Sequence, residues 1–273
     1  MYGRYTVRTL VREAVLLLCG FVFAIPLLGL VNLSLQPAVR SGGLLTPGPV
    51  TVANYVRAWN DANLGLALIN SLSITTASVI VIVLISSFAA YPLARITRRW
   101  SRWTFAGIVG GLLVPAQLAL LPLYTTMRYI GLVGTLPAVV IISVGTNLPF
   151  SIFLYTTFIR EIPTDYEEAA ILDGCGPIRS FISVLFPLLR PVTGTIIILN
   201  VVGIWNDFFT PLLYLSGTGT VTAPLAIYGF VSQYVTNWPL IFAGLVITVI
   251  PILLVYFSLQ KYVIRGFAGG LKG

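Results

Sequence analysis

The sequence predicts an all-helical protein that crosses a membrane six times, and three observations support this fold class. The 273 residues are 57% hydrophobic and only 9% charged, whereas soluble domains carry about 25% charged residues. The mean hydropathy is +0.95. Apolar stretches of about 20 residues, enough for a helix to span a bilayer, can be read six times, at 13–35, 68–92, 103–123, 136–158, 191–215 and 239–260.

The composition excludes several kinds of chemistry. Histidine is absent, which removes imidazole metal ligands, histidine-activated nucleophiles and histidine proton relays. Cys19 lies in an apolar run and Cys175 beside a basic loop, so neither suggests a disulfide or a metal site. The formal charge of +8 does not indicate nucleic-acid binding, because the cations form short groups between apolar runs.

The basic residues predict the orientation of the spans. All but three of the 16 Lys and Arg residues fall on one side of the six spans, and the exceptions are Arg40, Arg57 and Arg128. Because cytoplasmic loops are enriched in Lys and Arg, we expect both termini to be cytoplasmic. No small-residue cleavage site follows the first apolar run, so it is expected to be a retained span.

Polar side chains inside the predicted spans are candidates for a polar path, because they are costly in hydrocarbon unless paired or facing a cavity. Asn200 and Asp207 are seven residues apart and are expected to share a face of the fifth span. Asn147 in the fourth span is explained as well by an interhelical hydrogen bond as by substrate contact. For Gln117 in the third span, a role in helix packing is slightly favoured over substrate contact.

The segment from 160 to 190 is the longest loop on the basic side, and it contains five of the eight acids. Thr164 and Glu167 have the spacing of a capping box at a helix start. Acids in the first turn are favoured by the helix dipole. Gly174 supplies the permissive residue after the helix end, and Pro177 suits the first position of a second helix.

The second helix of this segment is expected to be amphipathic. Its apolar residues have the spacing of one helix face: Ile178, Phe181, Ile182, Leu185 and Phe186. Two interpretations remain open for the helix pair. It is either an interfacial hairpin on the lipid headgroups or a docking knob for a soluble cytoplasmic partner.

The same segment carries a resemblance to a known family. Glu168-Ala169-Ala170, three residues and then Gly174 resembles the EAA loop of the membrane subunits of ABC importers. Val and Phe stand where that family has Ile and Leu before Pro187, and Cys175 stands where it usually has Ala. In the family this loop inserts into a cleft of the ATP-hydrolysing subunit and transmits its closure to the membrane helices.

Three further segments resemble carbohydrate-importer permeases of the maltose-transporter class. They are 46–55 in the first external loop, Trp205-Asn206-Asp207-Phe208 in the fifth span, and the tail 262–273, which is similar to the ending of the MalG-like subunit. The resemblance implies a type I ABC importer (MetI-like) permease fold with six transmembrane helices. We expect an N-terminal segment 1–66, a five-helix core 67–260 with the coupling loop at 160–190, and a tail 261–273.

The resemblance, together with the polarity of the side chains, implies three groups of site residues. Coupling to the ATPase is expected at Glu168, Ala169, Ala170, Asp173 and Gly174. Translocation-path or substrate contacts are expected at Asn206, Asp207, Trp205, Asn147 and Gln117. An uncharged external loop at 216–238 is expected to contact a binding protein through Gln233, Tyr234 and Asn237.

The chain is expected to be a non-catalytic subunit. It has no Gly-x-x-x-x-Gly-Lys-Ser/Thr motif to hold nucleotide phosphates, so ATP and Mg are expected in a partner ATPase and no cofactor or metal in this chain. The implied partners are a second permease, a dimeric ABC ATPase, an extracytoplasmic binding protein and the lipid bilayer.

The predicted function is import of a sugar or oligosaccharide across the cytoplasmic (inner) membrane. Two alternatives remain: a permease for another solute such as glycerol phosphate, and a secondary transporter. The second has only Asp207 as an intramembrane ionisable group and no evident use for the 160–190 helix pair.

Overall fold

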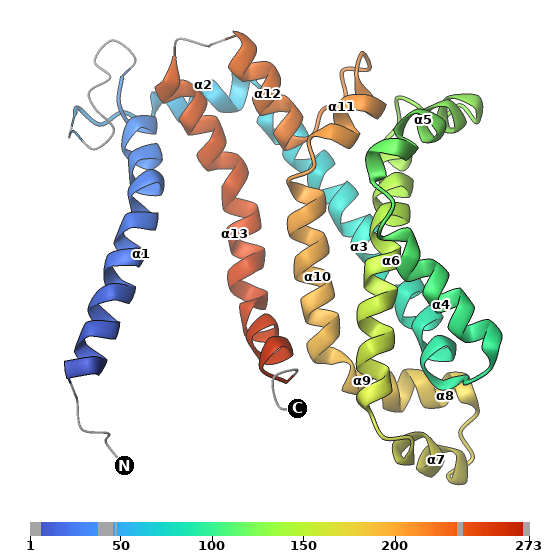
Figure 1. Ribbon diagram of the computed structural model, residues 1–273. Coiled ribbons are helices and arrows are strands. Elements are labelled where there is room, and N and C mark those ends of the chain that lie inside the picture. The colour runs from blue at the N-terminus through green and yellow to red at the C-terminus, as the bar shows by residue number, and fades with distance from the viewer. Residues whose placement is uncertain (1–6, 38–45, 47, 234–236, 270–273) are drawn as a thin grey trace. The chain divides into compact units, whose positions relative to one another are not determined.

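The computed structural model describes residues 7–37, 46, 48–233 and 237–269, and every regular element in these ranges is a helix (Figure 1). The all-helical fold class is therefore confirmed. The chain divides into two compact units. Unit one comprises 1–65 with 226–250, and unit two comprises 66–225 with 251–273. The three segments expected from the sequence stay a prediction.

Four helices in the described part of the chain are long and apolar enough to cross a membrane. They are α1 (Val7–Ser34), α3 (Leu64–Arg95), α6 (Leu136–Glu161) and the first part of α13 (Trp238–Gly269). A fifth span results if Pro177–Leu188 and Arg190–Trp205, which meet at a 75° bend, are counted as one. The number of six spans stays a prediction.

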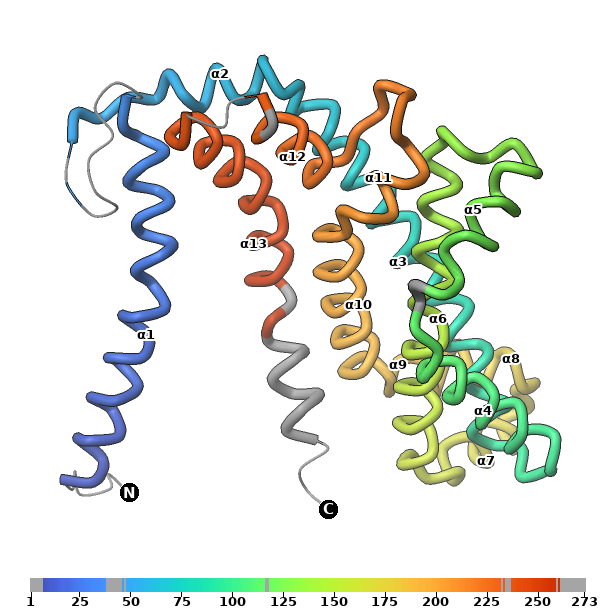
Figure 2. The backbone as a smooth tube through the Cα atoms, turned by 45° about the horizontal axis from the view of Figure 1, so that its top comes forward, coloured from blue at the N-terminus to red at the C-terminus, as the bar shows by residue number. Residues whose placement is uncertain are grey.

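The third predicted span, 103–123, is not one helix. Helix α4 (Arg99–Gly111) ends at two successive glycines, and the chain continues through the 3-10 turn η2 (Ala116–Ala119) into α5 (Leu120–Tyr129). Helix α5 runs in a different direction from α4 (Figure 2). Glycine is a weak helix former, and Pro115 lacks the N–H that would continue the helix. These residues together explain the break.

The fifth predicted span, 191–215, is also interrupted. Helix α10 (Arg190–Trp205) ends before Asn206, and α11 (Phe209–Leu215) begins three residues later. Asp207 Oδ1 accepts a hydrogen bond from the Thr210 backbone N–H (3.1 Å). Such local bonds compete with helix continuation. The expectation that Asn200 and Asp207 share a helix face was therefore wrong.

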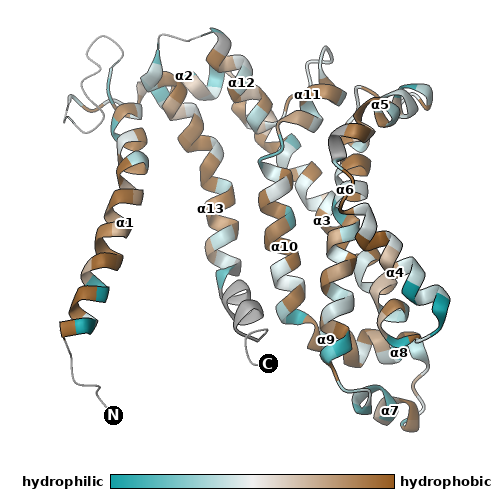
Figure 3. Ribbon diagram, in the orientation of Figure 1, coloured by the Kyte–Doolittle hydropathy of each residue, from teal (hydrophilic) through white to brown (hydrophobic). Residues whose placement is uncertain are grey.

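Unit one is held together around the chain that follows α1. The Asn54 side chain in α2 (Ala53–Asp61) donates to the Ser34 and Gln36 carbonyls at 2.9 and 2.8 Å. Ala58 of α2 and Leu240 of α13 are fully buried. Helix α1 buries only Gly29, Leu33 and Ser34, and its long apolar surface (Figure 3) suits contact with lipid.

Unit two has two apolar clusters. One joins α3, α6 and α11 through residues such as Ile82, Ala138 and Tyr214. The other lies where α3, α6 and α10 approach the 161–189 segment, and it includes Tyr155 and Ile196. Helices α5 and α11 lie at one end of the unit, and α7 (Asp165–Leu172), α8 (Pro177–Ser180) and α9 (Phe186–Leu188) lie at the other (Figure 1).

The turn between α5 and α6 gives a test of this packing. Gly134 has φ +91°, its N–H donates to the Tyr214 carbonyl at 2.7 Å, and an added Cβ would lie 3.0 Å from Thr218 Cγ2. We expect Gly134→Ala to lower the free energy of unfolding by roughly 1–2 kcal/mol, because a left-handed conformation costs an L-residue about this much. Thermal unfolding of the detergent-purified protein measures the change.

Gly145→Ala is the matched control, because Gly145 lies inside α6 and its Cβ would meet no atom within 4 Å. This substitution should leave the stability unchanged or raise it by about 0.5–1 kcal/mol. Equal losses in the two variants would contradict the role of the Gly134 turn.

Candidate functional site

The helix α7 begins differently from the sequence expectation. Asp165, Glu167 and Glu168 do lie in its first turn, but Thr164 makes no side-chain capping bond. The predicted capping box of Thr164 and Glu167 was therefore wrong. Its physical reason is that the Glu167 carboxylate turns away from the helix start and pairs with a side chain of another helix.

The end of α7 is as predicted. Gly174 has φ +83°, the Cys175 N–H donates to the Ala170 carbonyl, and the Gly174 N–H donates to the Ile171 carbonyl, both at 2.9 Å. This pair of bonds is the Schellman arrangement. A Cβ on Gly174 would meet nothing within 4 Å, so a side chain added there would project from the surface of the helix pair.

A buried ion pair fixes α7 to α3. Glu167 Oε2 lies 2.7 Å from Arg95 Nη2, and their side chains are only 8% and 17% exposed. Arg95 Nη2 also donates to the Ile162 carbonyl at 3.0 Å, just before α7. Tyr91, one turn earlier on α3, interacts with the Glu167 carboxylate. The position of α7 is thus set by the last turn of α3.

Helix α6 is fixed to the same end of α3. Arg160 Nη2 donates to the Leu93 carbonyl at 3.2 Å, and its guanidinium lies 4.5 Å above the Phe105 ring of α4. The Ser101 hydroxyl donates to the same carbonyl at 3.4 Å. The last carbonyls of a helix have no intrahelical donor. Here the Leu93 carbonyl is satisfied by side chains of α6 and α4.

The second helix of the segment divides its apolar residues between two environments. Phe181 and Leu185 are buried, and the Phe181 ring lies 4.8 Å from Phe88 of α3. Ile178 and Ile182 are 69% and 51% exposed. These residues were expected to form one apolar face, but two of them are buried and two are exposed. A π-helical turn, η3 (Phe181–Leu185), changes the angular spacing of these side chains.

The predicted coupling residues lie on or beside α7. Glu168, Ala169, Asp173 and Gly174 are exposed, and Ala170 is buried. Close to them in the sequence, Ile171 and Leu172 expose 59% and 88% of their surface. The segment thus presents carboxylates and apolar side chains to its surroundings while its inner face is anchored.

The break between α10 and α11 contains two of the predicted path residues. Asn206 is exposed, and its amide donates to the Val202 carbonyl at 2.9 Å. Asp207 is half-buried, and Trp205 is 5% exposed. The break therefore places one amide outside and one carboxylate beside a small internal space.

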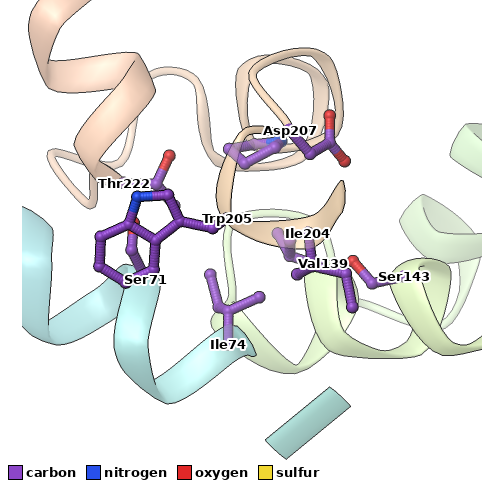
Figure 4. A pocket seen from close by; sticks show the side chains of 9 residues that line it. Ser71, Ile74, Val139, Ser143, Ile204, Trp205, Asp207 and Thr222 are labelled. Atoms are coloured by element: carbon purple, nitrogen blue, oxygen red, sulfur yellow. The ribbon is translucent and has the colours of Figure 1, made fainter. Parts of the chain in front are cut away.

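A cavity of about 10 Å³ lies next to this break, roughly the space that one water molecule occupies. In Figure 4, Trp205 and Thr222 lie on one side and Asp207 and Ser143 on the other. The Ser143 and Thr222 hydroxyls are buried and have no hydrogen-bond partner within the described structure. The cavity is polar enough for water, but it is far smaller than a sugar.

The other predicted path residues are separate from this cavity. The Asn147 amide donates to the Ser143 carbonyl of its own helix at 2.8 Å. The side chain of Gln117 is not described. The interhelical amide bond is made instead by Asn200, which donates to Ser151 Oγ of α6 at 3.2 Å.

The predicted binding-protein residues lie at and after the end of α12 (Ala223–Gln233). Gln233 is exposed, and Tyr234 lies outside the described residues. Asn237 Oδ1 accepts from the Leu240 N–H at 3.3 Å, which caps the start of α13. Asn237 therefore has a structural role in addition to any contact with the binding protein.

The sequence interpretation missed Arg95, Arg160 and Tyr91 as members of this site. Arg95 and Arg160 were counted only as loop charges. The sequence did contain a signal for an ion pair. Each arginine lies in the last turn of a long apolar helix, on the side where the acids of 160–190 lie. No group of three or more His, Cys, Asp or Glu residues in the described ranges is arranged to hold a metal ion.

The ion pair between Arg95 and Glu167 gives a second test. Arg95→Met or Glu167→Leu alone should lower the free energy of unfolding by roughly 3–5 kcal/mol, because each leaves one buried charge unpaired. The double variant should recover most of this loss. Thermal unfolding of the purified protein measures all three changes.

The exposed pair of Arg57 and Asp61, with 4.0 Å between its charged atoms, is the control. Asp61→Leu should change the stability by less than about 1 kcal/mol. Additive losses in the Arg95 and Glu167 variants would show that the two side chains do not act as a pair.

Comparison with known proteins identifies the family. The chain matches the model of the binding-protein-dependent transport system inner membrane component over residues 82–269. The melibiose/raffinose/stachyose import permease MelC of Bacillus subtilis (strain 168) is 34% identical over 229 residues, 83% of each chain. The diacetylchitobiose uptake permease NgcG of Streptomyces coelicolor is 31% identical over 268 residues, 95% of this chain and 87% of NgcG.

A solved structure supports the same fold. One chain of a bacterial ABC transporter that imports the acidic polysaccharide alginate has a TM-score of 0.80 and 23% identity, over 96% of this chain and 99% of that chain. The protein therefore belongs to the family of inner-membrane components of binding-protein-dependent transport systems, and it has the all-helical fold of ABC importer permeases.

Proposed function

We propose that this permease forms half of the path for a sugar or oligosaccharide through an ABC importer. The observation that carries the proposal is the family match together with relatives that import melibiose, raffinose, stachyose and diacetylchitobiose. A further relative, MsmG of Streptococcus mutans, belongs to a multiple sugar-binding transport system. This support for a saccharide is stronger than any for glycerol phosphate or for a secondary transporter.

The partners of the proposal follow from the family. A binding-protein-dependent system implies an external binding protein and an ATPase. The finer composition that we propose is a second permease, two ATPase copies that hold ATP and Mg, and one binding protein. Both termini are proposed to be cytoplasmic because all but three of the Lys and Arg residues fall on one side of the predicted spans.

The proposed coupling surface is the helix pair at 161–189. Glu168, Ala169, Asp173 and Gly174 offer exposed contacts to an ATPase, whereas Glu167 and Arg95 bind the pair to α3. A displacement of α7 by the ATPase would therefore be carried to α3 through a short, buried contact.

The proposed substrate contacts remain the polar groups beside the α10–α11 break. Asn206 and Asp207 provide an amide and a carboxylate, the groups that hydrogen-bond sugar hydroxyls. Trp205, Asn147 and Gln117 complete the proposed set. In this conformation Trp205 is buried, so its use as a stacking surface requires the break to rearrange.

The substrate class is tested in the reconstituted importer. The complex of both permeases and the ATPase, with its loaded binding protein in proteoliposomes, should hydrolyse ATP faster when raffinose or another oligosaccharide is present. Radiolabelled uptake of the same sugar checks that hydrolysis drives transport. Stimulation by a non-saccharide solute alone would overturn the sugar assignment but leave the family assignment intact.

Coupling is tested at Gly174. Gly174→Asp should leave the subunit in the membrane but reduce ligand-stimulated ATP hydrolysis at least about tenfold, the effect of losing roughly 1.4 kcal/mol of contact. The reason is that the new side chain projects into space that no atom of this chain occupies. ATPase activity of the reconstituted complex, with and without loaded binding protein, gives the measurement.

Gly131→Asp is the matched control, because Gly131 also has a positive φ, +73°, and open space around a Cβ. It follows α5, at the end of unit two opposite α7 (Figure 1). Normal stimulation in the Gly131 variant with loss in the Gly174 variant supports the coupling role. Unimpaired transport by the Gly174→Asp variant would contradict the coupling role.

The contact with the binding protein is tested in the external loop. Replacing Gln233, Tyr234 and Asn237 by Ala should lower transport and the stimulation by loaded binding protein, whereas basal hydrolysis persists. Because Asn237 caps α13, a second variant with Asn237→Asp keeps the cap acceptor. If both variants transport normally at every binding-protein concentration, the loop only covers the bundle.

A further inference from the structure

A groove opens beside the turn that joins α3 to α4 in unit two. Its volume is about 390 Å³, and it is lined by Arg99, Arg102, Trp103 and Ala106. Residues three and four apart on a helix are neighbours, so Arg99 lies next to both Arg102 and Trp103. The hydrophilic colour of this turn contrasts with the apolar turns that follow in α4 (Figure 3).

The arginines around this groove lack anionic partners among the described residues. Arg98, Arg99 and Arg102 are all exposed. The first turn of α4 contains no acid, and the ion pairs of the described chain involve Arg57 and Arg95 instead. Arg102 contacts only a neutral group, the Thr97 carbonyl, at 3.4 Å. Three neighbouring positive charges therefore have no ion-pair partner in the described part of the chain.

The groove is preformed rather than the product of a loose loop. The Ile96 N–H donates to the Pro92 carbonyl at 2.9 Å, which continues α3 into the turn. Ser101, between Arg99 and Arg102, is 1% exposed and donates to the Leu93 carbonyl. The inner side of the turn is thus bound to α3, and the arginines are held on its outer side.

Two tryptophans place the groove at a membrane surface. Trp100 and Trp103 are 50% and 76% exposed, which is costly in water for large apolar rings. Exposed tryptophan is enriched where helices meet the headgroup layer of a bilayer. Beyond the groove, 106–111 contains no charged residue, so α4 continues as a surface suited to acyl chains.

We propose that this groove binds the headgroup of an anionic phospholipid in the leaflet at the arginine-rich end of the spans. Guanidinium groups bind phosphate oxygens with two parallel hydrogen bonds, and basic pockets near the membrane surface recognise anionic headgroups. The charge, the adjacent tryptophans and the apolar continuation together fit a lipid better than a soluble anion. A lipid bound there would contact the turn whose other side fixes α6 and α7.

The experiment uses the complete transporter purified in detergent and titrated with phosphatidylglycerol. Native mass spectrometry gives the apparent dissociation constant. Arg99→Gln with Arg102→Gln should weaken binding about 30-fold, which corresponds to roughly 1 kcal/mol for each arginine near the membrane surface. Arg99→Lys with Arg102→Lys keeps the charge and should bind more tightly than the glutamine pair.

Arg8→Gln with Arg12→Gln is the matched control, because both arginines are exposed on α1 and the loss of charge is the same. This pair should leave the dissociation constant unchanged. Equal weakening in both glutamine pairs would overturn the proposal, since binding would then follow net charge alone. Equal affinity for phosphatidylethanolamine, or displacement of the lipid by inorganic phosphate, would overturn it too.

Loss of the ATPase subunit from the glutamine variant, measured in the same spectra, would assign the groove to a protein partner and would also overturn the proposal. Retention of the whole complex with weaker phosphatidylglycerol binding supports it.

Discussion

The contact between Glu167 and Arg95 determines how the 161–189 segment meets the bundle. A carboxylate and a guanidinium that are both removed from water are costly to bury and must remain paired. Arg95 ends α3, and its second contact, the Ile162 carbonyl, lies at the link between α6 and α7. One guanidinium therefore holds three helices in register. The Arg160 and Ser101 bonds to the Leu93 carbonyl extend the same arrangement to α4.

The opposite end of unit two has helix breaks where the first end has side-chain cross-links between helices. There the chain breaks its helices at Gly110–Gly111 and at Asn206–Phe208. Backbone carbonyls accept the next N–H groups at the first break, and a side chain does so at the second. Asp207 bonds to the Thr210 N–H. Breaks of this kind in membrane helices are tolerated where they are buried in protein or line a cavity. One end of the unit is thus cross-linked by side chains, and the other contains the two helix breaks.

Local rules allowed much of this to be predicted from sequence. Hydropathy located the apolar runs, and the glycine rule located the end of α7 at Gly174. The capping box failed because Glu167 has a stronger partner on α3, and no local pattern reports which distant charge a carboxylate will meet. The helix breaks were missed because hydropathy counts apolar residues without regard to Gly110, Gly111 and Pro115. The half-exposed face at Ile178 and Ile182 depended on a π-helical turn, which hydrophobic spacing does not reveal.

The 75° bend between Pro177–Leu188 and Arg190–Trp205 has a mechanical consequence. The Leu189 N–H at the corner bonds to both the Leu185 and Phe186 carbonyls, and Leu189 is fully buried. The corner is therefore stiff. Because of the 75° bend, a force directed along Pro177–Leu188 acts almost perpendicular to the axis of α10. Force applied to the 161–189 segment would therefore move α10 sideways. It would not move α10 along its own axis through the bilayer.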